Sequence, residues 1–136
     1  MNEKYKILIV SNEIKVINTL KKCLEQEGYQ FETTQTAINA LEKVKSDKYH
    51  IVLADIVMPQ MDGLELLRDI KEFDPMTQVI MIAEHSTMEK ILCSLEYGAN
   101  DYIDKPLENT EYVLSVILYS VQKLERWKEA ILQIVK

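Results

Sequence analysis

A carboxylate and an ammonium group are the side chains of this sequence whose positions most strongly indicate chemistry. Asp55 directly follows the apolar run 51–54, and Lys105 stands before Pro106 about fifty residues later. A buried carboxylate can act as a nucleophile, and an ammonium beside it can pair with that carboxylate or with an anionic ligand. Whether either chemistry is available depends on the elements that carry the two residues.

Short apolar runs that alternate with helical patterns predict those elements. The predicted strands are 7–10, 30–33, 51–54, 79–83 and 102–103, of which the second is the weakest. The first, third and fourth are nearly continuous in aliphatic residues, as expected of strands buried on both faces of a parallel sheet. Gly28, Pro75 and Gly98 mark the ends of intervening helices. The pattern predicts an α/β fold, a doubly wound parallel sheet in a three-layer sandwich.

The carboxyl ends of parallel strands meet at one rim of such a sheet, where ligands bind. The residues at the ends of the predicted strands therefore form the candidate site. They are Ser11, Asn12 and Glu13 after the first strand, Asp55 after the third, Ala83 and Glu84 at the end of the fourth, and Lys105 after the fifth.

Composition limits the function classes. The chain has 136 residues, is 47% hydrophobic and carries a formal net charge of −6, which fits one globular domain and disfavours direct binding to nucleic acid. Cys23 and Cys93 stand far apart without a CxxC pattern, so we expect neither a disulfide nor a zinc site. No apolar run approaches the ~20 residues of a membrane span, and no signal peptide is recognisable. We expect a cytoplasmic protein.

Two motifs give the chain a family resemblance. The segment D-I-V-M-P-Q-M-D-G at 55–63, followed by D-Y-I-D-K-P at 101–106, resembles the receiver domains of response regulators in two-component signalling. The resemblance covers about 6–120 and implies the flavodoxin-like (βα)5 fold. It also implies a phosphorelay signalling module rather than an enzyme.

The resemblance implies roles for individual residues. Asp55 is the expected phosphoacceptor, which takes the phosphoryl group from a kinase phosphohistidine. Lys105 is expected to hold the phosphoryl oxygens, with a cis peptide bond to Pro106. Tyr102 matches the aromatic residue that rotates inward on activation.

The metal ligands depart from the family pattern. Receiver domains carry two acidic residues after the first strand, where this chain has Ser11 and Asn12. Mg²⁺ prefers carboxylate and water oxygens, so the expected ligands are Asp55, Asn12 and the backbone of Val57, with weakened affinity. Glu13 is a substitute ligand to consider.

The phosphate contacts depart as well. Ala83 stands where the family has Thr or Ser, and its methyl group can neither bond a phosphoryl oxygen nor relay that bond to Tyr102. Ser86 lies too far along the chain to replace the hydroxyl. Glu84 adds a carboxylate that repels an incoming phosphoryl group.

These departures lead to two hypotheses. The domain is either a receiver that accepts phosphate slowly, or a pseudo-receiver that acts through protein binding without phosphorylation. In the second case Asp55 and Lys105 remain as an ion pair, and Ser11 and Asn12 serve as N-caps of the next helix.

The last helical segment is longer than one such domain needs. Residues 108–136 contain no Gly or Pro, and apolar residues recur at steps of four and three, at Ile117, Val121, Leu124, Ile131 and Val135. This spacing predicts a stalk or dimer seam, or else a terminal helix packed on the domain. We divide the chain into a receiver domain, 1–122, and an extension, 123–136.

The expected partner is a histidine kinase or another regulatory protein. A homodimer through the fourth helix, fifth strand and fifth helix, or through the C-terminal helix, is a further expectation. An Asp-nucleophile phosphatase is disfavoured by Val57, which stands where such enzymes have a second Asp. A flavin carrier is disfavoured because 11–15 is not a Gly-rich, Ser-rich and Thr-rich phosphate loop.

Overall fold

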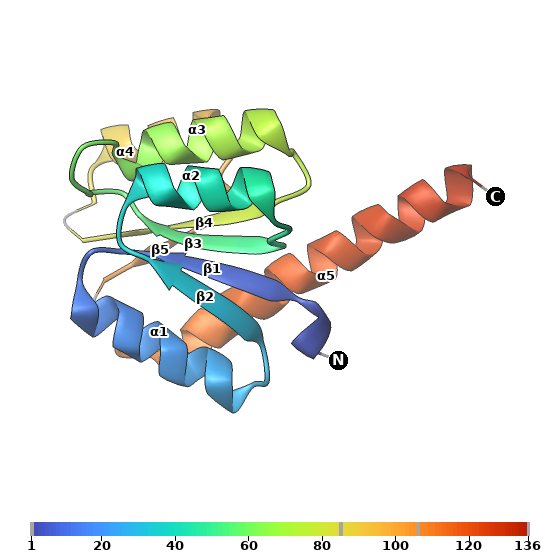
Figure 1. The fold of residues 1–136 in the computed structure, drawn as a ribbon, viewed down its shortest axis with the longest axis horizontal. Helices are drawn as coiled ribbons and strands as arrows, with labels where there is room; N and C mark the ends of the chain where they lie inside the picture. Colours follow the sequence, from blue (N-terminus) through green and yellow to red (C-terminus); the bar gives the residue numbers. More distant parts are fainter. Residues whose placement is uncertain (1, 85, 106, 136) are drawn as a thin grey trace.

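The structure is a computed structural model that describes residues 2–84, 86–105 and 107–135, with Glu3 described by its backbone alone. In this part of the chain, the centre is a five-stranded parallel sheet with the order β2-β1-β3-β4-β5 (Figure 1). The strands are β1 (Lys6–Val10), β2 (Gln30–Thr34), β3 (Ile51–Asp55), β4 (Gln78–Ala83) and β5 (Asp101–Asp104).

Helices cover both faces of the sheet. They are the short 3-10 helix η1 (Asn2–Lys4) and the α-helices α1 (Ile14–Gln26), α2 (Ala37–Ser46), α3 (Gly63–Phe73), α4 (Met88–Glu96) and α5 (Thr110–Ile134). The helices α1 and α5 pack on one face, and α2, α3 and α4 lie over the other (Figure 1). The predicted doubly wound, three-layer fold with a long last helix is confirmed.

The apolar pattern explains the sheet. Every residue of β3 and β4 is buried, and so is every residue of β1 after the first. The edge strand β2 has only Thr34 buried, which is why its sequence signal is weak. Most predicted strand ends agree with the observed ones within one residue. The helices begin at side-chain caps in four cases, supplied by Thr36, Asp62, Thr87 and Asn109.

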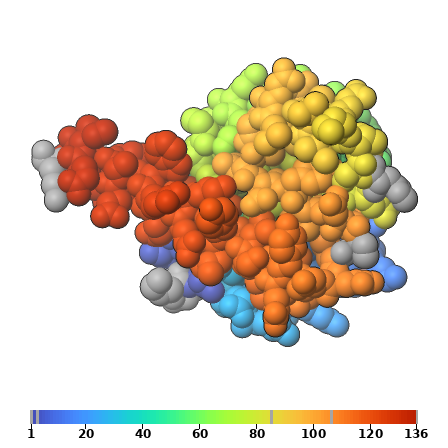
Figure 2. All heavy atoms as spheres, turned by 180° about the vertical axis from the view of Figure 1, so that it is seen from behind, coloured from blue at the N-terminus to red at the C-terminus, as the bar shows by residue number. Residues whose placement is uncertain are grey.

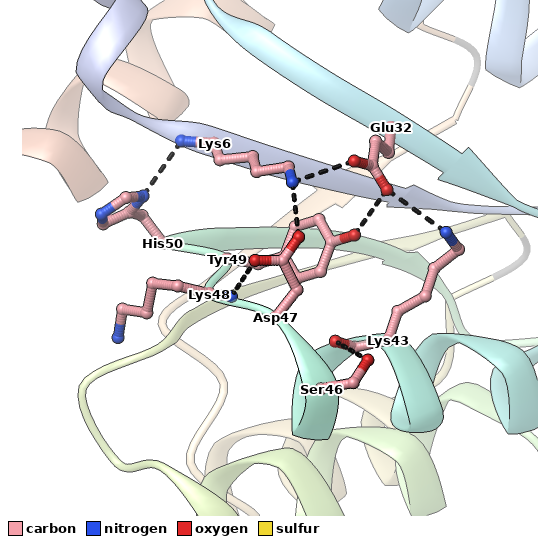
Figure 3. A network of polar contacts seen from close by, with 8 residues as sticks. All are labelled: Lys6, Glu32, Lys43, Ser46, Asp47, Lys48, Tyr49 and His50. Atoms are coloured by element: carbon pink, nitrogen blue, oxygen red, sulfur yellow. Dashed lines mark hydrogen bonds and ion pairs between the residues drawn. The ribbon is translucent and has the colours of Figure 1, made fainter.

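A network of charges joins β1, β2 and the end of α2 at the rim opposite the candidate site (Figure 3). The ammonium of Lys6 lies 2.7 Å from Asp47 Oδ2 and 2.9 Å from Glu32 Oε2. The hydroxyl of Tyr49 donates to Glu32 Oε1 at 2.6 Å, and Lys43 lies 3.2 Å from the same oxygen. The hydrogen bonds from Tyr49 and Lys6 lower the pKa of Glu32 to about 2. The network therefore ties three elements together through one carboxylate.

The last helix extends beyond the domain. The core-facing residues of α5 are buried from Val113 as far as Leu124, whereas Trp127, Ile131 and Val135 are exposed. Figures 1 and 2 show the C-terminal part of α5 standing clear of the other elements. The predicted boundary at 122/123 falls inside this continuous helix and stays a prediction. Within the described residues, none of the helices combines the length and apolarity that crossing a membrane requires.

The substitution Glu32→Gln is expected to lower the free energy of unfolding at neutral pH by about 1 kcal/mol, because water screens this partly exposed network. The pKa of Glu32 falls from 4.5 to about 2 on folding. The charge of Glu32 therefore stabilises the fold at pH values above the pKa of 4.5 in the unfolded chain, and that contribution is lost as the pH falls toward 2. Urea unfolding at about pH 7 and about pH 3 measures the change.

The exposed carboxylate of Glu42 on α2 provides the matched control. Glu42→Gln should leave the free energy of unfolding nearly unchanged at both pH values. A loss for Glu32→Gln that is the same at both pH values would contradict the prediction.

Candidate functional site

The site is built around a carboxylate at the end of the central strand β3. Asp55 is only 1% exposed, and its polar neighbours are residues that directly follow β1 and β5. The Ser11 hydroxyl donates to Asp55 Oδ2 at 2.5 Å. The other oxygen, Oδ1, accepts no hydrogen bond from the described residues, and the Lys105 ammonium lies 3.3 Å from it. The sheet therefore brings Asp55 and Lys105 together, as the rim pattern predicted.

Lys105 faces two carboxylates. Its ammonium lies 2.6 Å from Glu13 Oε1, closer than it lies to Asp55. The Lys105 backbone N–H donates to the Ala83 carbonyl at 2.7 Å, which holds the end of β5 against β4. The predicted cis peptide bond from Lys105 to Pro106 lies outside the described residues.

Burial and neighbouring charges shift the pKa values of Asp55 and Lys105 in opposite directions. Burial raises the pKa of Asp55 above its usual value, and the Ser11 hydroxyl and the Lys105 ammonium only partly offset this effect. Burial alone lowers the pKa of Lys105, but the hydrogen bond to Glu13 and the charge of Asp55 raise it to a net value above normal. The ammonium therefore stays charged, while the carboxylate is held in an environment that disfavours its charge.

The loop after Asp55 packs back on its backbone. Gly63 begins α3 so close to β3 that a Cβ atom there would lie 2.0 Å from the Asp55 carbonyl oxygen. Its N–H donates to the Ile56 carbonyl at 2.7 Å. Gln60, at the turn of the loop, has a φ of 68°, in the left-handed region. The glycine of the D-I-V-M-P-Q-M-D-G motif is thus required by the close approach of α3 to the site.

The comparison with known families decides what this arrangement is. A family model described as the response regulator receiver domain matches residues 7–117. The chain belongs to the response regulator receiver family. The resemblance inferred from the two motifs is therefore confirmed.

Curated relatives are transcriptional regulators of bacteria. YkoG of Bacillus subtilis is 34% identical over 114 residues, which are 84% of this chain and 50% of YkoG. The CpxR homolog of Haemophilus influenzae is 31% identical over 111 residues, 82% of this chain and 48% of the relative. ZraR of Klebsiella oxytoca is 36% identical over 106 residues, 78% of this chain and 24% of ZraR. The chain thus spans about half or less of the length of these relatives.

Solved receiver domains share the fold. A CheY-like receiver domain protein of Methanospirillum hungatei superposes with a TM-score of 0.86 at 33% identity, covering 90% of this chain and 97% of that chain. The BeF3-activated receiver domain of DrrB gives a TM-score of 0.79 at 30% identity, covering 87% and 97%. The sheet and helices described above are therefore those of a receiver domain.

This receiver lacks a hydroxyl at the end of β4. Ala83 is buried there with only a methyl group to offer. A pocket of about 600 Å³ lies at this rim, and its lining includes Asn12, Glu13, Val57, Ala83, Glu84 and Lys105. Every side chain predicted for the site except Ser11, Asp55 and Tyr102 thus lines one pocket, while Asp55 lies buried beside it through its contact with Lys105.

Tyr102 takes part in a separate cluster. Its hydroxyl and the Ser86 hydroxyl lie 2.9 Å apart, and Ser86 also donates to Asp104 Oδ1 at 2.5 Å. In the described part of the structure, the hydrogen bonds of the Ser86 side chain go to Tyr102 and Asp104, and the expectation that Ser86 cannot replace the hydroxyl missing at Ala83 stays a prediction. The bond of Ser86 to Tyr102 was not anticipated, because the two residues are sixteen positions apart.

The metal donors fit Mg²⁺ poorly. Among the described residues, no three His, Cys, Asp or Glu side chains gather where a metal ion could bind. Of the predicted ligands Asp55, Asn12 and Val57, only Asp55 supplies a carboxylate. Its oxygens already face the Ser11 hydroxyl and the Lys105 ammonium. The weakened Mg²⁺ site remains a prediction.

The predicted N-caps are wrong. The helix α1 begins at Ile14, and its N-cap residue is Glu13, whose side chain makes no capping hydrogen bond. The Ser11 hydroxyl accepts the Glu13 N–H at 3.1 Å and donates to Asp55. Ser11 is therefore committed to the turn before the helix and to the carboxylate. A serine directly after a buried strand, beside an aspartate on the next strand, is the signal that could have identified this role.

The substitution Asp55→Asn is expected to raise the free energy of unfolding at neutral pH, by an amount on the order of 1 kcal/mol, because it removes a buried charge and leaves Lys105 paired with Glu13. The pKa of Asp55 is raised by folding. Ionisation of Asp55 therefore lowers the free energy of unfolding as the pH rises through that pKa. The extra stability of Asp55→Asn should disappear at pH values below the pKa of Asp55 in the unfolded chain.

Urea unfolding of the parent protein and of Asp55→Asn, from neutral pH to below the unfolded pKa of Asp55, measures the difference in the free energy of unfolding. Asp55→Asn with a lower stability than the parent at neutral pH would show that the Lys105 pair outweighs the burial of the carboxylate.

Proposed function

We propose that this receiver domain accepts a phosphoryl group on Asp55 from a histidine kinase, with a rate reduced by the residues that replace the acidic pair and the Thr or Ser. The observation that carries the proposal is the buried Asp55 carboxylate with the Lys105 ammonium 3.3 Å from Oδ1. A carboxylate with a cation at its free oxygen can attack phosphorus while the cation takes up the charge of the phosphoryl oxygens.

The chemistry is a transfer between two nucleophiles. An Asp55 oxygen forms a bond to phosphorus, and the bond from phosphorus to the imidazole nitrogen of the kinase histidine breaks. Oδ1 is the oxygen available for this attack, since Oδ2 holds the Ser11 hydroxyl. The BeF3-activated state of DrrB is a precedent in a relative for activation at this fold.

Three features support the reduced rate. Ser11 and Asn12 supply no charge for a metal, Ala83 supplies no hydroxyl, and the exposed Glu84 adds negative charge at the same pocket. Each missing carboxylate removes an attraction of several kcal/mol at ~4 Å, before desolvation is subtracted.

A second candidate function is a pseudo-receiver that acts by protein binding alone. The contacts of Asp55 with Ser11 and Lys105 favour it, because each carboxylate oxygen already faces a protein partner without a phosphoryl group. The bond between Ser86 and Tyr102 also holds the switch residue without any contact with Asp55. A phosphatase remains disfavoured, since Val57 offers no second carboxylate.

The output function is expected to reside in a separate domain. Curated relatives are named as transcriptional regulators and are at least twice as long as the matched segment. We propose that α5 leads to an output domain in the full protein, and that pairing of two copies brings two such domains together. A cytoplasmic location and the absence of direct nucleic-acid binding by this domain remain predictions.

Incubation with acetyl phosphate and Mg²⁺ is expected to add one phosphoryl group slowly, because Asp55 is in place but its metal and phosphate contacts are reduced. Intact mass spectrometry measures the adduct over time, with and without Mg²⁺. Asp55→Ala provides the control and should carry no adduct. No adduct at high donor and metal concentrations would reject phosphorylation and favour the pseudo-receiver.

Restoring the missing groups is expected to increase the rate. Ser11→Asp with Asn12→Asp should lower the Mg²⁺ concentration for half-maximal rate by on the order of tenfold, which corresponds to about 1.4 kcal/mol of added attraction. Ala83→Thr should raise the rate at saturating Mg²⁺ instead, because a hydroxyl acts on the phosphoryl oxygens. The two effects are separated by titrating Mg²⁺ for each variant. Equal rates in parent and variants would show that the substitutions at these positions do not limit phosphotransfer.

A further inference from the structure

The ammonium of Lys105 is shared unequally between two carboxylates. It lies 2.6 Å from Glu13 Oε1 and 3.3 Å from Asp55 Oδ1. The shorter distance is that of a charge-assisted hydrogen bond. The longer contact leaves Asp55 Oδ1 buried without a hydrogen bond from the described residues. The cation therefore sits nearer to the more exposed of its two partners.

The ion pair between Lys105 and Glu13 is part of a larger, partly buried set of contacts. Lys105 has a side chain only 9% exposed, whereas that of Glu13 is 45% exposed. The Glu13 backbone N–H donates to the Ser11 hydroxyl, which in turn donates to Asp55. Asp55, Ser11, Glu13 and Lys105 thus form a closed ring of contacts. Within this ring Glu13 is held at its backbone N–H by Ser11 and at its carboxylate by Lys105.

We propose that Glu13 is a positioning residue that holds the Lys105 ammonium short of Asp55 in the resting domain. The inference rests on the proposed function, because its consequence is that Lys105 must leave Glu13 before it can bind an incoming phosphoryl group. A phosphoryl group on Asp55 carries more negative charge than the Glu13 carboxylate, so it competes for the ammonium. Glu13 therefore slows phosphorylation and is displaced when phosphorylation occurs.

If Glu13 were instead a substitute Mg²⁺ ligand, its removal would have the opposite effect on the rate of phosphotransfer. A carboxylate that binds the metal speeds phosphotransfer, and its loss raises the Mg²⁺ concentration required. The contact with Lys105 favours the positioning role, since Glu13 Oε1 already accepts a hydrogen bond from the ammonium.

The first test compares rates of phosphorylation by acetyl phosphate. Glu13→Gln, which keeps the shape and removes the charge, should raise the rate about threefold, the size expected from losing a partly exposed ion pair. The Mg²⁺ concentration for half-maximal rate should stay unchanged. Glu84→Gln is the matched control, because it removes a carboxylate from the same pocket without touching the ring. Its rate should rise less than that of Glu13→Gln.

A double-variant cycle shows whether the effect passes through Lys105. In a Lys105→Ala background, Glu13→Gln should change the rate no more than Glu84→Gln does, because the ammonium that Glu13 restrains is gone. A slower Glu13→Gln variant that requires more Mg²⁺ would overturn the proposal in favour of a metal ligand. Equal gains for Glu13→Gln with and without Lys105 would overturn it in favour of simple charge repulsion.

The second test needs no phosphorylation. The ammonium signal of Lys105 in ¹⁵N-resolved NMR spectra, assigned with Lys105→Arg, should shift in Glu13→Gln and stay in place in Glu84→Gln. An unshifted signal in Glu13→Gln would overturn the proposal even if the rates behave as expected. If the parent protein and its Ser11→Asp, Asn12→Asp variant both fail to accept phosphate, the proposed function fails, and this spectrum still decides whether Glu13 holds Lys105.

Discussion

Placing the Asp55 carboxylate in the interior is the constraint on which the rest of the site depends. A buried charge destabilises a fold by several kcal/mol unless partners surround it. The partners come from other strands, the Ser11 hydroxyl after β1 and the Lys105 ammonium after β5. In the order β2-β1-β3-β4-β5, β3 lies next to β1 and one strand away from β5, and the parallel pairing brings the ends of all three strands to one rim. The parallel topology is thus the means by which one carboxylate is made tolerable.

The two rims of the sheet balance charge differently. At the amino rim the ammonium groups of Lys6 and Lys43 meet the carboxylates of Glu32 and Asp47, so opposite charges are equal in number and water screens them. At the carboxyl rim the ammonium of Lys105 faces two carboxylates, those of Glu13 and Asp55, and is itself largely buried. The first arrangement serves to hold elements together. In the second, two carboxylates share one ammonium, and we expect this excess of negative charge to oppose the arrival of a phosphoryl group.

The sequence was sufficient for the fold and for the pairing of Asp55 with Lys105, because both derive from the apolar periodicity and from the rule that parallel strands end at one rim. The sequence was not sufficient to predict which partners the polar side chains contact. Ser11 was expected to cap a helix, yet its hydroxyl points to Asp55. Glu13 reaches Lys105 across ninety-two positions, a contact that depends on the final packing of β1, β5 and the start of α1. Such contacts are decided by ångström-scale geometry that no local pattern encodes.

The candidate site and Tyr102 belong to two separate clusters of side chains. Asp55 and Lys105 belong to the ring completed by Ser11 and Glu13, whereas Tyr102 is bonded to Ser86. Ala83 lies at the end of β4 with no hydroxyl to join the clusters. Its carbonyl, however, accepts the backbone N–H of Lys105 at 2.7 Å. A rearrangement at Asp55 that moves Lys105 acts on β5 through this backbone hydrogen bond, and we expect it to reach Tyr102 by displacing the strand, a larger change than the rotation of one hydroxyl. We expect the two clusters to be weakly coupled, because that displacement opposes the close packing of β4 and β5.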